Sequence, residues 1–214
     1  MNMRCPTGSN RSEIPLTGSW KFFEPKSKRW LPATVPGCVH LDLRSHGLIP
    51  DPFWGSNELD LQWIEHVDWK YRTEFSVSNE MLSSGQIDLV ADGLDTLATV
   101  LINGREIART ENMFTSYRFP VRSHLQKGRN ELEIRFASTT PYIAKDKAKD
   151  HYAEWNDPVG GCSVIRKEQC QLGWDWGSRF VTAGIYKRIA LECWSENRID
   201  SLRIGMERIR APVA

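Results

Sequence analysis

The sequence has no hydrophobic run long enough to cross a membrane. Its longest mostly apolar run, Leu97–Ile102, has the length of a single strand, whereas a membrane-spanning helix needs about 20 apolar residues. The segment Met1–Leu16 is polar and lacks the apolar core of a secretion signal. We therefore expect a cytoplasmic chain that makes no membrane contact.

An excess of charge of one sign is also missing. The chain of 214 residues carries 28 Lys and Arg against 27 Asp and Glu, a formal net charge of +1. This balance argues against a broad electrostatic surface for nucleic acid. Hydrophobic residues make up 40%, which is too many for a disordered chain, so we expect a folded domain. The chain is too short to hold this domain together with a catalytic barrel of about 250 residues.

Metal and cofactor motifs are absent. The cysteines form no C-x-x-C pair and the histidines show no H-x-x-x-H spacing, so no metal site is predicted. No G-x-S-x-G, P-loop or G-x-G-x-x-G motif occurs, and no cofactor is expected. Reduced thiols are expected of a cytosolic chain, with a Cys162–Cys170 disulfide as the alternative. The five cysteines are Cys5, Cys38, Cys162, Cys170 and Cys193.

The patterns that are present are those of β-strands. Apolar and polar residues alternate over residues 69–77, 132–136, 189–193 and 202–206, which is typical of strands with one face in water. Helical patterns are weak and limited to residues 38–46 and 142–152. About nine or ten short strands and few helices indicate an all-β fold, an antiparallel β-sandwich with one or two short helices.

Two turns support this interpretation. Asn103-Gly104 separates two strand-like runs, which predicts a type I′ hairpin because both central residues of that turn need positive φ. Gly128 and Asn130 mark a second turn.

The most distinctive segment is Trp174-Asp175-Trp176, which Gly173 and Gly177 flank. The glycines favour a loop with unusual backbone angles rather than a strand. Two rigid indoles around one carboxylate suit a sugar site, because indole faces stack on C–H surfaces while the carboxylate accepts hydrogen bonds from hydroxyl groups. The alternative is a Trp pair in the core with Asp175 capping a turn.

Two other segments are ambiguous from their residues alone. The charged stretch Arg166-Lys167-Glu168-Gln169-Cys170 is either a solvated loop or a support for the Trp-Asp-Trp loop. Asn112-Met113-Phe114 follows the predicted hairpin and is either a second loop at the rim of the site or the lead into a strand.

No catalytic residue is assigned in this chain. Hydrolysis of a glycoside with retention of configuration needs two carboxylates about 5–5.5 Å apart, and the sequence singles out no such pair. Asn-Glu dipeptides carry little information here, since three occur: Asn57-Glu58, Asn79-Glu80 and Asn130-Glu131.

Several motifs, in order along the chain, resemble the β-mannosidases of glycoside hydrolase family 2. The resemblance extends from about Trp20 to Trp194 and is most specific from Ile165 to Gly177. The matching motifs are Val35–Leu43, Gly47–Phe53, Gln62–Ile64, Asp68–Tyr71, Gly93–Thr96, Asn103-Gly104, Asn112–Phe114, Ile165–Cys170, Trp174–Gly177 and Gly184-Ile185. Ser178-Arg179-Phe180 departs from the family, in which proline is common after the Trp-Asp-Trp-Gly core.

The resemblance implies a galactose-binding-like jelly-roll β-sandwich, the N-terminal sugar-binding domain of that family. In the family this domain packs against an immunoglobulin-like module and a (β/α)8 barrel, and the barrel carries both catalytic glutamates. The domain supplies a loop to the pocket for the terminal mannosyl unit. The resemblance implies that Trp174, Asp175, Trp176 and Asn112 contact the β-mannoside, and that Arg166, Lys167 and Gln169 support the loop without touching sugar.

We therefore expect the N-terminal domain of a retaining β-mannosidase-like enzyme that hydrolyses terminal non-reducing β-D-mannose residues. The 214-residue chain alone is expected to be inactive. Residues 1–195 form the sugar-binding domain in this interpretation, and residues 196–214 form a linker and the possible first strand of an absent immunoglobulin-like module. The alternatives are a stand-alone carbohydrate-binding module and a purely structural domain that supports the barrel.

Overall fold

Alternating apolar and polar residues build the central pair of strands. The computed structural model describes residues 11–147, 154, 159–195, 197, 199 and 201–205. Strand β4 (Trp69–Val77) buries every second side chain and pairs antiparallel along its whole length with β10 (Gly128–Phe136). Trp69, the first residue of β4, lies opposite Phe136, the last residue of β10. The strand predicted over residues 69–77 is confirmed.

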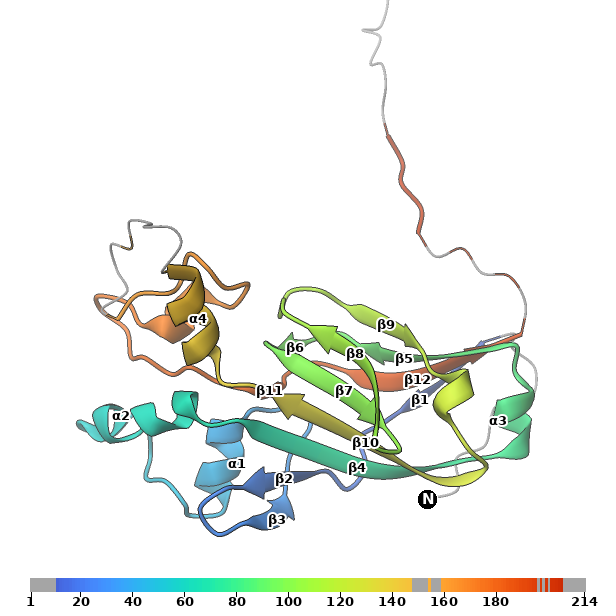
Figure 1. The fold of residues 1–214 in the computed structure, drawn as a ribbon, viewed down its shortest axis with the longest axis horizontal. Coiled ribbons are helices and arrows are strands. Elements are labelled where there is room, and N and C mark those ends of the chain that lie inside the picture. Colours follow the sequence, from blue (N-terminus) through green and yellow to red (C-terminus); the bar gives the residue numbers. More distant parts are fainter. Residues whose placement is uncertain are drawn as a thin grey trace, which may run out of the picture.

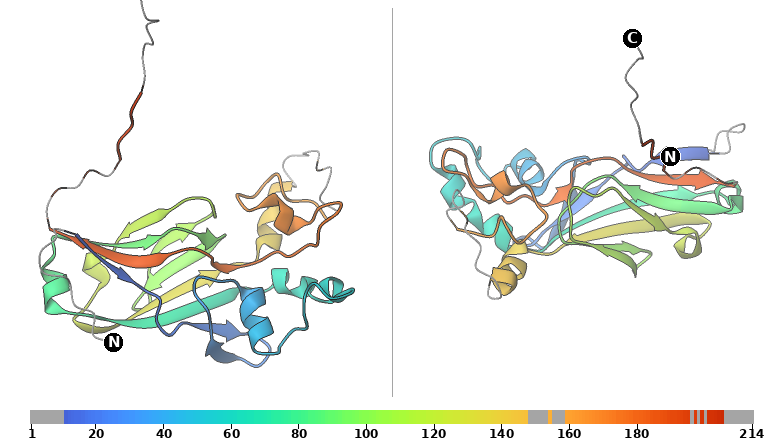
Figure 2. Two further views of the ribbon diagram at one scale, coloured as in Figure 1. Left: turned by 180° about the vertical axis from the view of Figure 1, so that it is seen from behind. Right: turned by 90° about the horizontal axis from the view of Figure 1, so that it is seen from above.

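The strands form two facing antiparallel sheets, as Figures 1 and 2 show. One sheet has the order β1-β12-β5-β9 and the other β3-β2-β4-β10-β7-β8, while β11 pairs with β6 in a short separate ladder. This arrangement confirms the β-sandwich. The remaining strands are β1 (Arg11–Pro15), β2 (Lys21–Glu24), β3 (Arg29–Pro32), β5 (Gln86–Ala91), β6 (Leu94–Asp95), β7 (Ala98–Ile102), β8 (Arg105–Thr110), β9 (Tyr117–Pro120), β11 (Gly184–Ile185) and β12 (Ile189–Trp194).

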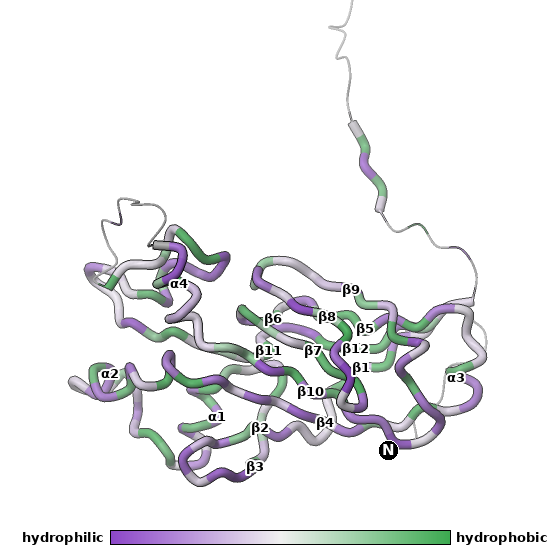
Figure 3. Tube along the Cα trace, in the orientation of Figure 1, coloured by the Kyte–Doolittle hydropathy of each residue, from purple (hydrophilic) through white to green (hydrophobic). Residues whose placement is uncertain are grey.

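The core between the sheets is rich in aromatic side chains. Trp20, Phe22, Trp69, Tyr71 and Phe136 are almost fully buried, and each such side chain contributes about 1.5–3 kcal/mol by leaving water. The indole N–H of Trp20 donates to the Leu16 carbonyl at 2.6 Å and that of Trp69 to the Ile64 carbonyl at 3.0 Å. The polar edges of these rings are therefore satisfied inside the core. Hydrophobic residues also line the segments around α2, outside the sandwich (Figure 3).

The helical elements are short and lie in the connections. They are the α-helices α1 (Val39–Ser45), α2 (Asn57–Asp60), α3 (Asn79–Ser83) and α4 (Thr139–Lys147), and the 3-10 helices η1 (Gln62–His66), η2 (Arg122–His124) and η3 (Gln169–Leu172). The helix predicted over residues 38–46 corresponds to α1. The one predicted over residues 142–152 corresponds to α4, which begins earlier, and residues 148–153 lie outside the described part. The described residues thus hold more α-helices than the one or two expected.

The strand predicted over residues 202–206 does not form. Residues 201–205 lie outside any strand, and Leu202 and Ile204 are exposed. Alternation makes a segment suitable for a sheet, but a strand also needs a partner, and the preceding β12 already pairs with β1 and β5. Met206 lies outside the described residues.

The loops concentrate at one end of the sandwich. Figure 1 shows α1, α2 and α4 together with the orange segment before β11 at one end, while α3 lies at the other, and the view from behind in Figure 2 agrees. A small second hydrophobic cluster of Ile143, Ile165, Leu172 and Val181 packs beneath these loops. This end therefore has a core of its own and can hold loops in fixed positions.

The hairpin between β7 and β8 confirms the turn predicted at Asn103-Gly104. Asn103 has a φ of +51° and Gly104 a φ of +76°, as a type I′ turn requires. The Asn103 amide also donates to the His124 carbonyl at 3.0 Å and to Oδ1 of Asn130 at 2.9 Å, and its Oδ1 accepts from the Glu131 N–H at 3.0 Å. The residue therefore stabilises both its own turn and the neighbouring one.

We expect the two functions of Asn103 to separate in a pair of variants. Asn103→Gly keeps the positive φ but removes the side-chain hydrogen bonds, so the free energy of unfolding should fall by about 1–2 kcal/mol. Asn103→Ala adds the strain of a left-handed backbone and should cost about 1 kcal/mol more. Urea unfolding measures both. Equal stability of the two variants would contradict the backbone argument.

Helix α1 buries two ionisable residues at the loop end of the sandwich. Asp42 accepts hydrogen bonds from the Tyr71 hydroxyl at 2.7 Å and the Thr34 N–H at 2.8 Å, although burial raises its pKa. His40 has Nδ1 buried without a hydrogen-bond partner among the described residues. Burial lowers the pKa of His40 from 6.5 to about 4, and the nearby Lys167 cation acts in the same direction. His40 is therefore neutral in the folded chain at pH 7.

The lowered pKa of His40 predicts a loss of stability in acid. Because the unfolded chain binds this proton more readily, the contribution is fully present above pH 6.5 and is lost as the pH falls toward 4. The loss amounts to about 3 kcal/mol at the acid end. Urea unfolding at several pH values measures this effect. Between pH 6.5 and pH 4, the free energy of unfolding should fall less for His40→Gln than for the wild-type chain. Parallel profiles for both chains would rule out this assignment.

Candidate functional site

The Trp-Asp-Trp segment forms a tight turn at the loop end of the sandwich. Gly173, with a φ of +104°, ends η3 and turns the chain outward, a conformation that favours glycine. The Gly177 N–H then donates to the Trp174 carbonyl at 3.3 Å, which closes a β-turn with Asp175 and Trp176 at its centre. The predicted loop is therefore present, with one of its two glycines in the left-handed region.

The turn presents its side chains to solvent. Trp176 is 79% exposed and Asp175 is exposed as well, while Trp174 is partly buried. The two indole rings meet edge to face, with centroids 5.5 Å apart and an interplanar angle of 75°. Since Trp176 is exposed, the alternative of a Trp pair in the core does not describe this structure. The Asp175 carboxylate is accessible to a ligand.

An aromatic cavity of about 590 Å³ lies beside this turn. Its size and mainly apolar wall are in the range of small-molecule sites. Phe180 forms part of the wall, between the ring of Phe53 at 5.1 Å and that of His40 at 5.8 Å. Asp175 lies at the tip of the turn, outside the lining set. The lining residues are Phe53, Cys170, Gln171, Trp174, Trp176, Gly177, Ser178, Phe180 and Thr182.

A buried ion pair lies behind the cavity. The side chains of Lys167 and Asp95 are 0% and 3% exposed and are hydrogen-bonded to each other. Lys167 Nζ also donates to the Thr182 carbonyl at 2.7 Å. Burial lowers the pKa of Lys167, and the Asp95 carboxylate opposes this effect. The cation predicted to support the loop is thus enclosed, and it contacts the cavity wall at Thr182.

A second buried cation fixes the far side of the turn. Arg179 donates from Nη1 to the Leu172 carbonyl and from Nη2 to Glu65 Oε2 at 2.9 Å. Its backbone N–H donates to Glu58 Oε1 at 2.5 Å, and its carbonyl accepts from Gln62 Nε2 at 3.1 Å. In the sequence Arg179 lies in a segment that departs from the family pattern, and nothing there marks it as an anchor. The structure makes it the link between both ends of the turn and η1.

Asn112 lies on a neighbouring loop and forms a local turn. Its Oδ1 accepts from the Phe114 N–H at 2.9 Å, and its backbone pairs with Arg166 in an isolated parallel bridge. The Met113 N–H donates to the Arg166 carbonyl at 3.0 Å. The loop is therefore joined to the 166–168 segment, although Asn112 itself is outside the set that lines the cavity.

The three residues predicted to support the loop have different surroundings. Lys167 is buried, whereas Arg166 and Gln169 are exposed. Lys167 contacts Thr182, which lines the cavity beside the turn, and Arg166 has a backbone link to Asn112. Gln171 and Thr182, which the sequence did not single out, line the cavity and lie within hydrogen-bond distance of each other, with Thr182 Oγ1 2.7 Å from Gln171 Oε1.

The alternative disulfide is absent. Cys170 is an exposed free thiol, so the Cys162–Cys170 bridge does not form. Cys5 lies outside the described residues. In the described part of the chain, no three His, Cys, Asp or Glu side chains are grouped so that they could bind a metal ion, and no helix there has the length and apolar character of a membrane span.

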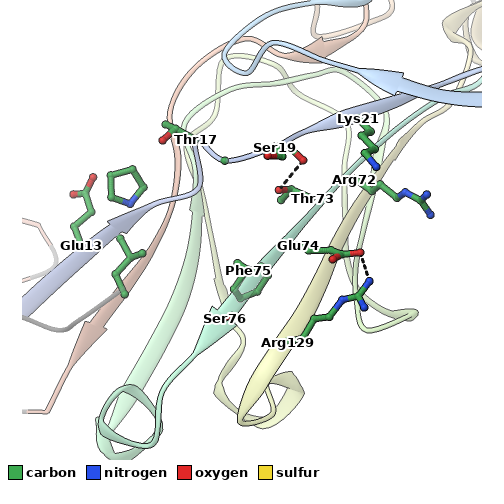
Figure 4. A pocket seen from close by; sticks show the side chains of 13 residues that line it. Glu13, Thr17, Ser19, Lys21, Arg72, Thr73, Glu74, Phe75, Ser76 and Arg129 are labelled. Atoms are coloured by element: carbon green, nitrogen blue, oxygen red, sulfur yellow. Dashed lines mark hydrogen bonds and ion pairs between the residues drawn. The ribbon is translucent and has the colours of Figure 1, made fainter. Parts of the chain in front are cut away.

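A larger cavity of about 860 Å³ lies elsewhere, along β1, β2 and β4. Figure 4 shows its polar wall, with hydroxyl groups of Thr17, Ser19 and Thr73. Its charged residues include Glu74 and Arg129, which form an ion pair with each other. It has neither the exposed indoles nor the convergent loops of the smaller cavity, which we take as the candidate site.

The carboxylates beneath the turn are held by protein groups. Glu65 binds Arg179, Asp95 binds Lys167, and Glu58 accepts from the Arg179 backbone. Asp175 is the carboxylate that the turn itself presents. The site therefore has the groups to bind a hydroxylated ligand through stacking and hydrogen bonds, and none of these carboxylates is paired with a second one for acid–base hydrolysis.

Large apolar side chains are exposed at the site and in the segment that contains α2. Phe53 and Trp54, which precede α2, are each 77% exposed, and Leu59 within α2 is exposed as well. Together with Trp176 they form what we call the apolar rim (Phe53, Trp54, Leu59 and Trp176). Apolar groups gathered in this way on a surface commonly mark a site that contacts another molecule or domain.

The chain is similar in sequence to curated β-mannosidases. The chain is 40% identical over 191 residues to the β-mannosidase of Bos taurus, which covers 85% of this chain and 22% of that protein. It is also 40% identical to β-mannosidase B of Thermothelomyces thermophilus, covering 90% of this chain and 23% of the relative. The chain thus spans about a fifth of the length of these relatives.

The solved structures agree. The crystal structure of a β-D-mannosidase from Dictyoglomus thermophilum superposes with a TM-score of 0.86 and 39% identity, over 93% of this chain and 24% of that one. The family model described as "Glycosyl hydrolase 2 galactose-binding domain-like" matches residues 20–187, which include β4, β5, β10 and the Trp-Asp-Trp turn. The chain therefore belongs to the galactose-binding-like domain family of glycosyl hydrolase 2.

Proposed function

We propose that this chain is the N-terminal domain of a retaining β-mannosidase-like glycoside hydrolase, which hydrolyses terminal non-reducing β-D-mannose residues. The observation that carries the proposal is an exposed carboxylate, Asp175, on a turn whose two flanking indoles contact each other, in a chain that is similar to β-mannosidases. The turn forms one wall of the mannosyl pocket. Asp175 binds sugar hydroxyls, and Trp174 and Trp176 contact the C–H faces of the ring.

The hydrolytic step is assigned to polypeptide outside this chain. The relatives are more than four times as long as the matched region, which leaves room for a catalytic barrel and an immunoglobulin-like module. Half a pocket encloses a monosaccharide poorly and gains little affinity. We accordingly assign residues 1–195 to the sugar-binding domain and residues 196–214 to a linker that leads into the next module.

The apolar rim supports this arrangement. Phe53, Trp54 and Leu59 are exposed, and of these three only Phe53 lines the cavity. We propose that part of this surface packs against the barrel, so that the turn faces the catalytic glutamates.

A stand-alone carbohydrate-binding module is the second candidate. The cavity of about 590 Å³ is large enough for a monosaccharide without help from another domain, which is the observation that favours it. The two candidates differ in the affinity of the isolated chain, since a self-sufficient module must bind sugar by itself.

The isolated 214-residue chain should not hydrolyse a chromogenic β-mannoside, because it lacks the catalytic pair. Calorimetric titration with mannose should give no binding tighter than about millimolar. Turnover that persists after repurification would contradict the assignment of the chemistry to another domain. Submillimolar mannose binding would instead favour the stand-alone module.

In the longer enzyme, Asp175→Ala should reduce kcat/KM for a β-mannoside more than about tenfold, since a hydrogen bond to a charged group contributes about 1.5–3 kcal/mol. The unfolding midpoint should stay unchanged because Asp175 is exposed. Asp60→Ala, at an exposed aspartate of α2, is the matched control and should have wild-type kinetics. Wild-type kinetics for Asp175→Ala would favour a purely structural domain.

A further inference from the structure

The buried pair of Lys167 and Asp95 calls for an explanation beyond stability. Both side chains are almost completely enclosed, and taking two charges out of water costs about as much as their attraction returns. A pair of apolar side chains of similar volume would be at least as stable in many proteins. What an ion pair adds is direction, because its hydrogen bonds hold particular atoms in particular places.

Those bonds converge on Thr182. Lys167 Nζ donates to the Thr182 carbonyl at 2.7 Å, and the Thr182 hydroxyl donates to Asp95 Oδ2 at 2.6 Å. Both the backbone and the side chain of Thr182 are thus fixed by the pair. Asp95 lies on β6 and pairs with Gly184 on β11, so the pair also ties Thr182 to the short ladder next to it.

Thr182 in turn holds the helix that precedes the turn. Its N–H donates to Gln171 Oε1 at 3.3 Å, and its hydroxyl lies 2.7 Å from the same oxygen. Gln171 belongs to η3, which ends at Leu172, directly before Gly173 and Trp174. Gln171 and Thr182 both line the cavity. A continuous set of hydrogen bonds therefore runs from the buried pair to the short helix that directly precedes the turn.

We propose that Asp95, Thr182 and Gln171 are positioning residues, through which the Lys167–Asp95 pair sets the orientation of the Trp174-Asp175-Trp176 turn. The pair acts on the turn from behind the cavity and does not touch the ligand. Its importance for sugar binding rests on the proposed function, but its effect on the geometry of the turn does not. The two can therefore be tested separately.

The orientation of the turn can be measured in the 214-residue chain through the relative orientation of its two indoles. Rings 5.5 Å apart at 75° couple their electronic transitions and give a circular dichroism couplet, which is isolated by subtracting the spectrum of Trp176→Phe. Thr182→Val removes the hydroxyl and keeps the shape. It should lower the couplet amplitude at least about twofold in folded protein, because the turn loses its directional support. Thr182→Ser keeps the hydroxyl and should restore the amplitude.

The charged pair is tested with a double variant, Asp95→Leu with Lys167→Met, which removes both charges together. We expect it to unfold near the wild-type temperature and yet to lose the couplet. A folded double variant with a full couplet would overturn the proposal, and so would a full couplet in Thr182→Val. If the double variant fails to fold, the comparison of Thr182→Val with Thr182→Ser decides.

The effect of the network on turnover of a sugar substrate is measured in the longer enzyme. Thr182→Val should lower kcat/KM for a β-mannoside about fivefold, with Thr182→Ser near wild type, because a displaced binding group loses part of its contact. A changed couplet with unchanged kinetics would support the positioning network and count against the sugar-binding function of the turn. An unchanged couplet would overturn the network whatever the kinetics.

Discussion

The exposed Trp174-Asp175-Trp176 turn depends on support from below. A group that binds a hydroxylated ligand must be open to water, and an open turn cannot be held by burying its own side chains. Here two buried cations supply the rigidity: Lys167 with Asp95 on one side and Arg179 with Glu65 on the other. Each has hydrogen bonds to backbone carbonyls as well as to a carboxylate. The cost of desolvating these charges is offset only when the ion pairs and hydrogen bonds have this arrangement. The loop therefore has few alternative conformations.

The sandwich makes this support possible by bringing distant segments to one end. In the sequence, residue 95 precedes the hairpin formed by β7 and β8, and residue 167 follows it. The two residues meet because β6 pairs with β11. Residues 58–65 reach Arg179 through α2 and η1, which lie beyond the start of β4. The sheets themselves carry no part of the site. They fix the positions from which the loops start, and the small cluster around Leu172 fills the space beneath them.

Local patterns were enough to predict the parts of the fold that depend on neighbours in sequence. The alternation in residues 69–77 and the Asn103-Gly104 turn both form as expected, because a strand face and a type I′ turn are set by a few consecutive residues. The Trp-Asp-Trp loop and Lys167 also stood out in the sequence. The partners of Lys167 did not, since Asp95 lies far away in the chain and becomes its neighbour only after the sheets assemble. The alternation in residues 202–206 failed for the same reason, as it says nothing about whether a partner strand exists.

One wall residue of the cavity has a chemical consequence of its own. Cys170 is an exposed thiol and lies beside Gln171 and Trp174 in the lining. Oxidants and alkylating reagents reach exposed thiols most readily, and any group attached to this sulfur would occupy the space next to the indoles. The same atom offers a point at which a reporter dye can be fixed within the cavity wall. Preparations of the domain therefore need a reducing agent if the cavity is to stay open.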